Sequence, residues 1–191
     1  MTRKVEVVPY HLDWPSRFAD EARALAAVFG DQLLSIHHFG STAIPGTSAK
    51  PIIDILVIVR DIDAVDALNA RLLALNYSPV GEYGIPGRRF FYKGTAELRT
   101  HHLHAYQTGN PQILRHLAFR DYMRAHPRSA HDYSLLKESL AKRFPEDMDS
   151  YILGKNAFVK EQEQRAMEWY REHETPVSSR GSSTSLQEET R

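Results

Sequence analysis

Residues 33–59 read LLSIHHFGSTAIPGTSAKPIIDILVIV, and this stretch decides the fold. Residues 33–39 and 51–59 are predominantly apolar, whereas the segment between them contains the glycine, proline, serine and threonine of a loop. Residues 51–59 are an almost continuous β-branched run broken by one acid, Asp54, which is typical of a strand covered on both faces of its sheet. The stretch therefore predicts two strands joined by a loop that begins at Gly40.

The sequence before and after this stretch predicts helices. Upstream, apolar side chains recur at helical spacing from Phe18 to Phe29, Asp13 is a plausible N-cap, and Gly30 favours a stop. Downstream, a second apolar stripe at helical spacing covers residues 65–75.

The rest of the chain changes from strands to helices. Asn76-Tyr77 and the glycines at 81, 84 and 87 mark turns. The segments RRFFYKG and RTHHLHAY then predict two neighbouring strands joined by a glycine turn. Beyond Pro111 the apolar spacing is helical in three successive segments. This order predicts an α+β fold, in which helices pack around a mixed α/β sheet. We expect one domain at 1–174 and a disordered tail at 175–191, which is rich in Ser, Thr and Glu.

Composition and charge exclude several classes of protein. Lys plus Arg and Asp plus Glu each number 24, so the formal net charge is zero, which argues against broad electrostatic capture of nucleic acid or of an anionic membrane. The sequence has no cysteine, which excludes disulfides, thiolate zinc sites and a cysteine nucleophile. It shows no apolar leader and no run of membrane-spanning length, so we expect a cytoplasmic protein with no nucleic-acid or membrane partner.

Asp54 is the most informative candidate for a functional residue. Burying its carboxylate as an ion in an apolar strand costs several kcal/mol unless the carboxylate is paired or binds a metal. Side chains alternate along a strand, so Asp54 shares a face with Ile52 and Leu56 and not with a second acid. The functional interpretation is a metal ligand or a general base; the alternative is a hydrogen bond to a neighbouring loop.

The loop before this strand is a candidate phosphate site. Gly40, Ser41 and Thr42 offer small side chains, hydroxyls and backbone N–H groups between two strands, although most such triplets are simple turns. Lys50 precedes the second strand and would add a point charge beside a phosphate, or is a solvated loop lysine.

Two histidines on the last predicted strand are candidate metal ligands. His102 and His104 are two residues apart, so both project from one face, whereas His101 points the other way. Two imidazoles at this spacing are able to bind one metal or one anion, and structural or surface histidines are the alternative. We take Asp54, His102 and His104 as the candidate catalytic and metal-binding residues.

Further basic residues are candidates for contacts with a phosphate. Some of them lie one helical turn from a neighbouring polar residue, and others stand at the start of the two predicted strands. The alternative interpretation is that the helical residues form exposed charged faces. The candidate phosphate-binding set consists of Gly40, Ser41, Thr42, Lys50, Arg89, Arg99, Arg120, Lys137 and Lys155.

Five separate segments, in this order and spacing, resemble the GrpB family over nearly the whole chain up to about His173. They are VVPYHLDWPSRF, HHFGSTAIPGTSAKPIIDILV, HLHAY, FRDYMRAHP with Tyr133 and Lys137 downstream, and YILGKNAFV. The resemblance implies a nucleotidyltransferase-like core with additional C-terminal helices. A GrpB-like domain is also found fused to dephospho-CoA kinases, which hints at nucleotide or coenzyme A chemistry.

In the superfamily that this resemblance implies, a Gly-Ser pair precedes a strand bearing two acids, and a later strand supplies a third, so that two magnesium ions are held. Gly40, Ser41 and Asp54 match the first parts of this pattern, whereas Leu56 stands where the second acid is expected. His102 and His104 stand where the third is expected. One Asp with two His favours a borderline transition metal over magnesium, and the identity of the divalent metal (Mg, Mn or Zn) stays open.

Three functions remain open from the sequence. The first is a nucleotidyltransferase-like enzyme that acts on a small nucleotide or other phosphate-bearing substrate with a divalent metal. The second is a non-catalytic module that binds a nucleotide or coenzyme A. The third is a metal-dependent hydrolase that uses Asp54, His102 and His104.

Overall fold

The computed structural model describes residues 4–173, so the tail expected at 175–191 lies outside the described residues. Five strands form one mixed sheet in the order β1-β2-β5-β4-β3. The strands are β1 (Leu33–Phe39), β2 (Ile53–Val59), β3 (Tyr77–Gly81), β4 (Arg88–Gly94) and β5 (Arg99–Gln107). Neighbouring strands pair antiparallel except β2 and β5, which pair parallel.

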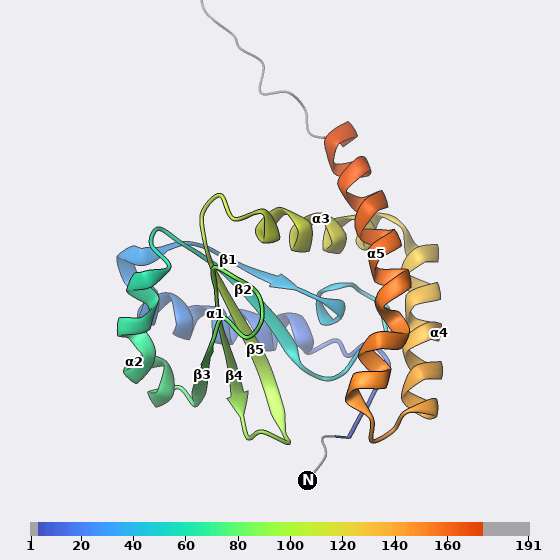
Figure 1. Cartoon of the computed structure of the whole chain (residues 1–191), viewed down its shortest axis with the longest axis horizontal. Helices are drawn as coiled ribbons and strands as arrows, with labels where there is room; N and C mark the ends of the chain where they lie inside the picture. The colour runs from blue at the N-terminus through green and yellow to red at the C-terminus, as the bar shows by residue number, and fades with distance from the viewer. Residues whose placement is uncertain (1–3, 174–191) are drawn as a thin grey trace, which may run out of the picture.

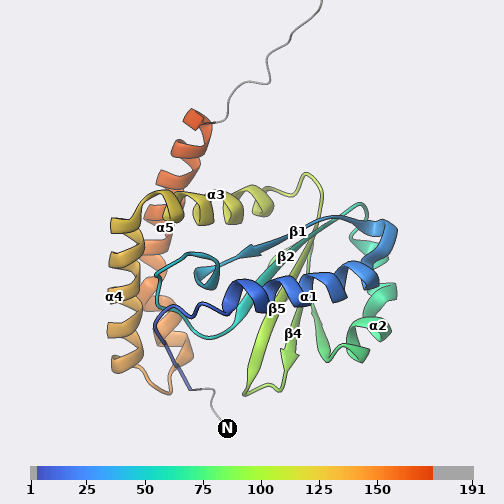
Figure 2. The ribbon, with the colours of Figure 1, turned by 180° about the vertical axis from the view of Figure 1, so that it is seen from behind.

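Two helices cover one face of this sheet, as Figure 2 shows for α1. They are α1 (Trp14–Phe29) and the short α2 (Asn69–Ala74), which follows the 3₁₀ segment Asp63–Leu68. Alternate side chains of β2 and β5 point into the apolar core beneath them, and burial of this apolar surface is the main stabilising term of the fold. The remaining side chains of these strands, Asp54 and His102 among them, therefore face the opposite side.

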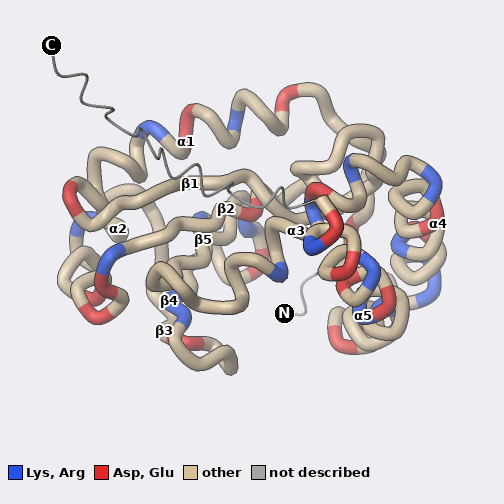
Figure 3. The backbone as a smooth tube through the Cα atoms, turned by 90° about the horizontal axis from the view of Figure 1, so that it is seen from above, with Lys and Arg blue, Asp and Glu red and all other residues tan. Residues whose placement is uncertain are grey.

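The opposite side is bordered by a helical layer from the C-terminal half of the chain. It consists of α3 (Pro111–Ala125), α4 (Pro127–Arg143) and α5 (Met148–His173). In Figure 1, α4 and α5 run side by side at one edge of the sheet and α3 lies across its top. Figure 3 shows acidic and basic residues interspersed along these helices. Among the described residues, no helix is both long enough and apolar enough to cross a membrane.

Most elements predicted from the sequence are present. The α+β class with a mixed sheet is confirmed, as are the helix that ends before Gly30, the strands at 33–39 and 53–59, the β4–β5 pair and three C-terminal helices. The turns predicted at Asn76, Gly84 and Gly87 are confirmed, whereas those predicted at Tyr77 and Gly81 are wrong, because residues 77–81 form β3. Tyr77 is fully buried there, and Pro79 is tolerated because β3 is the edge strand.

Candidate functional site

The parallel pairing of β2 with β5 brings the predicted acid and the two histidines together. Asp54 lies opposite His102 in the register, and Leu56 lies opposite His104. The Nδ1 atom of His102 is 3.1 Å from the Oδ1 atom of Asp54, although the two residues are 48 apart in sequence. One ligand atom from each of Asp54, His102 and His104 lies within 4.8 Å of the others, so the three side chains converge on one point.

The polar atoms of this cluster fit a divalent metal. The Nε2 atoms of His102 and His104 are buried and make no hydrogen bond within residues 4–173. Burial holds the pKa of His104 well below its usual value, so its imidazole is neutral near pH 7 and a ring nitrogen keeps a lone pair for a ligand. One carboxylate and two imidazoles are a donor set suited to zinc or manganese.

Asp54 is ionised in this setting although its side chain is only 27% exposed. Burial raises the pKa of its carboxyl, but the hydrogen bond with His102 and the electrostatic influence of the two histidines and of Lys50 outweigh burial and hold the pKa below its usual value. The carboxylate is thus available as an anionic ligand.

Gly40 approaches this carboxylate more closely than any other residue type allows. A Cβ atom placed on Gly40 would lie 2.4 Å from the Oδ2 atom of Asp54, and the φ angle of Gly40 is +69°. The phosphate cradle stays a prediction for this glycine, and the structure shows that its lack of a side chain leaves room for the Asp54 carboxylate.

A cavity of about 560 Å³ opens from the three converging residues toward α4 and α5. Asp54 is the one acid among the described residues that line it. Basic side chains surround the remainder of the cavity, and low-dielectric walls strengthen the attraction of such charges for an anion. These basic residues are Lys50, Arg88, Arg115, Lys137 and Lys155.

A second cavity of about 480 Å³ adjoins the first on the side of β4. Asp54, His102 and His104 line both cavities, so the converging residues stand where the two meet. Arg99, a member of the predicted phosphate set, lines the second cavity, with its guanidinium over the ring of Tyr92.

Ser41 and Thr42 line the first cavity from the loop that follows β1. The Oγ1 atom of Thr42 is 2.9 Å from the Nε2 atom of His38, and this hydrogen bond ties the loop to the strand. Lys50 also lines the cavity, with its Nζ atom 5.7 Å from the centre of the Tyr151 ring. Lys155 approaches the same ring at 5.6 Å. These four predicted residues therefore lie around one space.

Lys137 is the most unusual of the basic residues. It is 2% exposed, its Nζ atom makes no hydrogen bond with any described residue, and that atom lies 4.2 Å from the centre of the Tyr133 ring. Burial, aided by the charge of Lys155 and opposed by that of Glu138, lowers the pKa of Lys137 to about 7. Its amine is therefore partly neutral at physiological pH.

Replacing Lys137 by Met is expected to stabilise the protein by about 3 kcal/mol at pH 7. The unfolded chain binds a proton that the folded chain gives up between pH 7 and 10.5, so the wild type gains stability as the pH rises through this window. The advantage of Lys137→Met should therefore be greatest at pH 7 and below and should vanish near pH 10.5.

Urea denaturation at several pH values measures this difference. Lys142→Met, on the exposed side of the same helix, is the control and should change stability little. A Lys137→Met protein less stable than the wild type throughout this range would contradict the assignment of a buried, destabilising amine.

Two predicted arginines lie away from the cavity. Arg89 pairs with Asp63 and Asp66 beyond the opposite face of the sheet. Arg120 donates to the carbonyl oxygen of His38 and to the carboxylate of Asp121. Arg120 thus joins α3 to the end of β1, a structural contact and not a contact with the cavity.

Arg88 and Arg115 are site residues that the sequence did not single out. Arg88 lines both cavities, and its Nη1 atom is 3.4 Å from the Nδ1 atom of His104. Strand alternation places Arg88 and not Arg89 on the same face as Phe90, but only the structure shows that Phe90 lies opposite His104 in the register. No local pattern marked Arg115.

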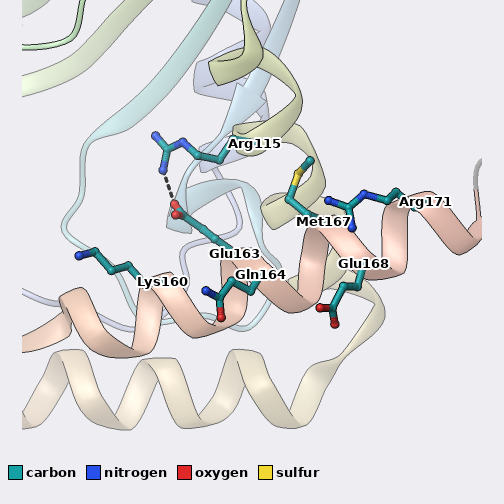
Figure 4. A pocket seen from close by; sticks show the side chains of 7 residues that line it. All are labelled: Arg115, Lys160, Glu163, Gln164, Met167, Glu168 and Arg171. Carbon is teal, nitrogen blue, oxygen red and sulfur yellow. Dashed lines mark hydrogen bonds and ion pairs between the residues drawn. The ribbon is translucent and has the colours of Figure 1, made fainter.

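A separate groove of about 380 Å³ lies between α3 and the C-terminal half of α5. Figure 4 shows acidic and basic side chains along it and the ion pair between Arg115 and Glu163. Arg115 thus stands between the groove and the main cavity.

Known proteins of one family match this chain over most of its length. The model of the family described as GrpB protein matches residues 4–165. The crystal structure of the conserved protein GrpB from Enterococcus faecalis superposes with a TM-score of 0.84 at 44% sequence identity, covering 87% of this chain and 99% of that one.

Two curated relatives are longer than this chain. UPF0157 protein YqkA of Bacillus subtilis is 48% identical over 167 residues, which are 87% of this chain and 48% of the relative. Dephospho-CoA kinase of Mycolicibacterium paratuberculosis is 28% identical over 189 aligned residues, which cover 86% of this chain and 46% of the relative. The chain therefore spans about half the length of each of these relatives.

Proposed function

The chain belongs to the GrpB family, and from this premise we propose that it is a metal-dependent enzyme with a nucleotidyltransferase-like core. It would transfer a nucleotidyl or phosphoryl group from a small nucleotide or another phosphate-bearing substrate. The observation that carries the proposal is the convergence of Asp54, His102 and His104 at the end of a cavity whose other charged side chains are all basic, among the described residues.

Different residues of the cavity would bind the phosphate groups and the metal in such a reaction. Lys50, Arg115 and Lys155 would bind the phosphate groups, because they supply positive charge around one cavity. Asp54, His102 and His104 would hold the divalent metal. When bound, a metal at this point would supply a Lewis acid for a phosphoryl oxygen.

The junction of the two cavities suits a reaction between two substrates. The phosphate donor would occupy the basic cavity and the acceptor hydroxyl would enter from the side of β4, so that the reacting atoms meet beside Asp54. The transfer forms a bond from the acceptor oxygen to phosphorus and breaks a phosphorus–oxygen bond of the donor. If water takes the place of the acceptor, the same residues make the protein a metal-dependent hydrolase.

Incubation with nucleoside triphosphates labelled at the α or γ phosphate, in the presence of Mg²⁺, Mn²⁺ or Zn²⁺, tests the proposal. We expect a labelled acceptor, a labelled protein or free hydrolysis products, which separate transfer from hydrolysis. Asp54→Asn should lower the rate by at least about 10-fold, because the amide removes the negative charge of a metal ligand.

Asp132→Asn is the matched control, since Asp132 is exposed on α4 outside both cavities. It should turn over at the wild-type rate. Absence of any labelled product with all three metals, or equal rates for the wild type and Asp54→Asn, would refute the proposed enzyme.

A non-catalytic module that binds a nucleotide or coenzyme A is the second candidate function. Leu56 favours it, because this residue is fully buried beside His104 where a two-magnesium site would need an acid. The similarity to a dephospho-CoA kinase also favours ATP or coenzyme A as the ligand of such a module. Calorimetric binding of ATP or coenzyme A that is unchanged by a chelator, without turnover, would support the module over the enzyme.

A further inference from the structure

Lys137 is buried and its amine makes no hydrogen bond with any described residue, whereas a lysine that only binds phosphate can do so from an exposed position. The Lys137 side chain extends from α4 and lines the cavity, with the Nζ atom 4.2 Å from the centre of the Tyr133 ring and under the electrostatic influence of a second basic residue, Lys155. Glu138, the one acid in its electrostatic surroundings, receives a hydrogen bond from the Oγ atom of Ser48 at 2.6 Å. The amine therefore has neither a carboxylate partner nor another hydrogen bond among the described residues.

An amine in such a place is a nucleophile. Desolvation and a neighbouring cation both disfavour the ammonium form, and the neutral amine carries the lone pair that attacks an electrophile. The lowered pKa agrees with this reading, since a large part of Lys137 is neutral at pH 7 to 8. Exposed lysines with a pKa near 10.4 are almost entirely protonated there.

We propose that Lys137 is a covalent site for small phosphate-bearing aldehydes or ketones, with which its amine forms an imine. Lys50, Arg115 and Lys155 would hold the phosphate group, and the cavity of about 560 Å³ is of the size that encloses a small molecule. This activity goes beyond the proposed transfer reaction and shares with it only the affinity of the cavity for phosphate.

The step balances without a further reactant. The Lys137 nitrogen attacks the carbonyl carbon, a carbon–nitrogen bond forms, and the carbonyl oxygen accepts a proton to give a carbinolamine. Loss of that oxygen as water, with the last proton of the amine, leaves the carbon–nitrogen double bond. The buried position limits competing reactions with solvent.

Labelling the full chain with pyridoxal 5′-phosphate, followed by borohydride reduction and peptide mass spectrometry, tests the proposal. The phosphate-bearing aldehyde should label Lys137 first, with a rate that is half-maximal near pH 7. Pyridoxal, which lacks the phosphate, should label it at least about 10-fold more slowly. Inorganic phosphate should protect Lys137 by competition.

Two variants separate the covalent site from general binding. Lys155→Met keeps the Lys137 amine and should slow labelling by pyridoxal 5′-phosphate much more than labelling by pyridoxal, which loses only the part of the lowered pKa that the charge of Lys155 supplies. Lys137→Arg keeps a positive charge and should abolish labelling at this position, with the circular dichroism spectrum as the control for folding.

Labelling confined to exposed lysines such as Lys142, or equal rates with pyridoxal and pyridoxal 5′-phosphate at Lys137, would overturn the proposal. Asp54→Asn separates this test from that of the transfer reaction. Labelling that persists in Asp54→Asn supports an independent amine site even if no transfer activity is found.

Discussion

Asp54→Ala is expected to lower the affinity of the protein for Zn²⁺ or Mn²⁺ by about 100-fold or more. Changes in residues that only support metal ligands already cost about 10- to 100-fold, and Asp54 would supply the one negative charge of the ligand set. His102→Ala and His104→Ala should each have an effect of similar size, because one donor is removed from the same point. Isothermal titration calorimetry after removal of metals with a chelator measures the affinities.

His101→Ala is the matched control for this prediction. His101 lies next to His102 on β5 but faces α1, where Glu21 and Lys93 determine its electrostatic surroundings. Its replacement should leave metal affinity within about 3-fold of the wild type. Equal losses for His101→Ala and His102→Ala, or no stoichiometric binding by the wild type, would contradict the assignment of the three ligands.

Gly40→Ala is expected to destabilise the protein by about 3 kcal/mol and to disturb the site. Two penalties combine, because the backbone at φ +69° and ψ −171° is one that residues with a Cβ rarely adopt, and the new methyl group would overlap the Asp54 carboxylate. To relieve the overlap, Asp54 must move away from its contact with His102. We therefore expect weaker metal binding together with a lower melting temperature.

Gly46→Ala separates these two penalties. Gly46 lies in the same loop at φ +75°, but apart from Gly46 itself and its two chain neighbours, no heavy atom of residues 4–173 lies within 4 Å of the place where its Cβ would be. This variant should lose only about 1 kcal/mol and should bind metal as the wild type does. If Gly40→Ala and Gly46→Ala lose the same stability and both retain metal affinity, the contact between Gly40 and Asp54 has no role in the site.

Most of the fold was predictable from patterns of a few neighbouring residues. The stretch 33–59 gave two strands and their loop, since hydrophobic runs and turn residues act over a few positions. Edge strand β3 was missed because Asn76-Tyr77 and the glycines from Gly81 onward match turns by composition. Only pairing with β4 and burial of Tyr77 make this segment a strand.

The candidate site was predictable only in part. Asp54 stood out because one acid interrupts an apolar run, and His102 and His104 stood out because two like side chains share a strand face. The sequence indicated Arg89 as the phosphate-binding arginine of β4, but the arginine that lines the cavity is its neighbour Arg88. Strand alternation is evident from the sequence, but which of the two alternating sets faces the site is not.

By itself, the sequence determined four of the five strands, the main helices and the isolation of Asp54 among apolar residues, because spacing and local chemistry decide these features. Only the tertiary structure decided that Asp54 meets His102 and that the Lys137 amine is buried with no hydrogen bond to any residue in 4–173. The register of β2 against β5 joins residues 48 positions apart, and the desolvation of Lys137 depends on α4, α5 and the sheet together. Both depend on contacts between distant segments, which the spacing of residues along the chain does not encode.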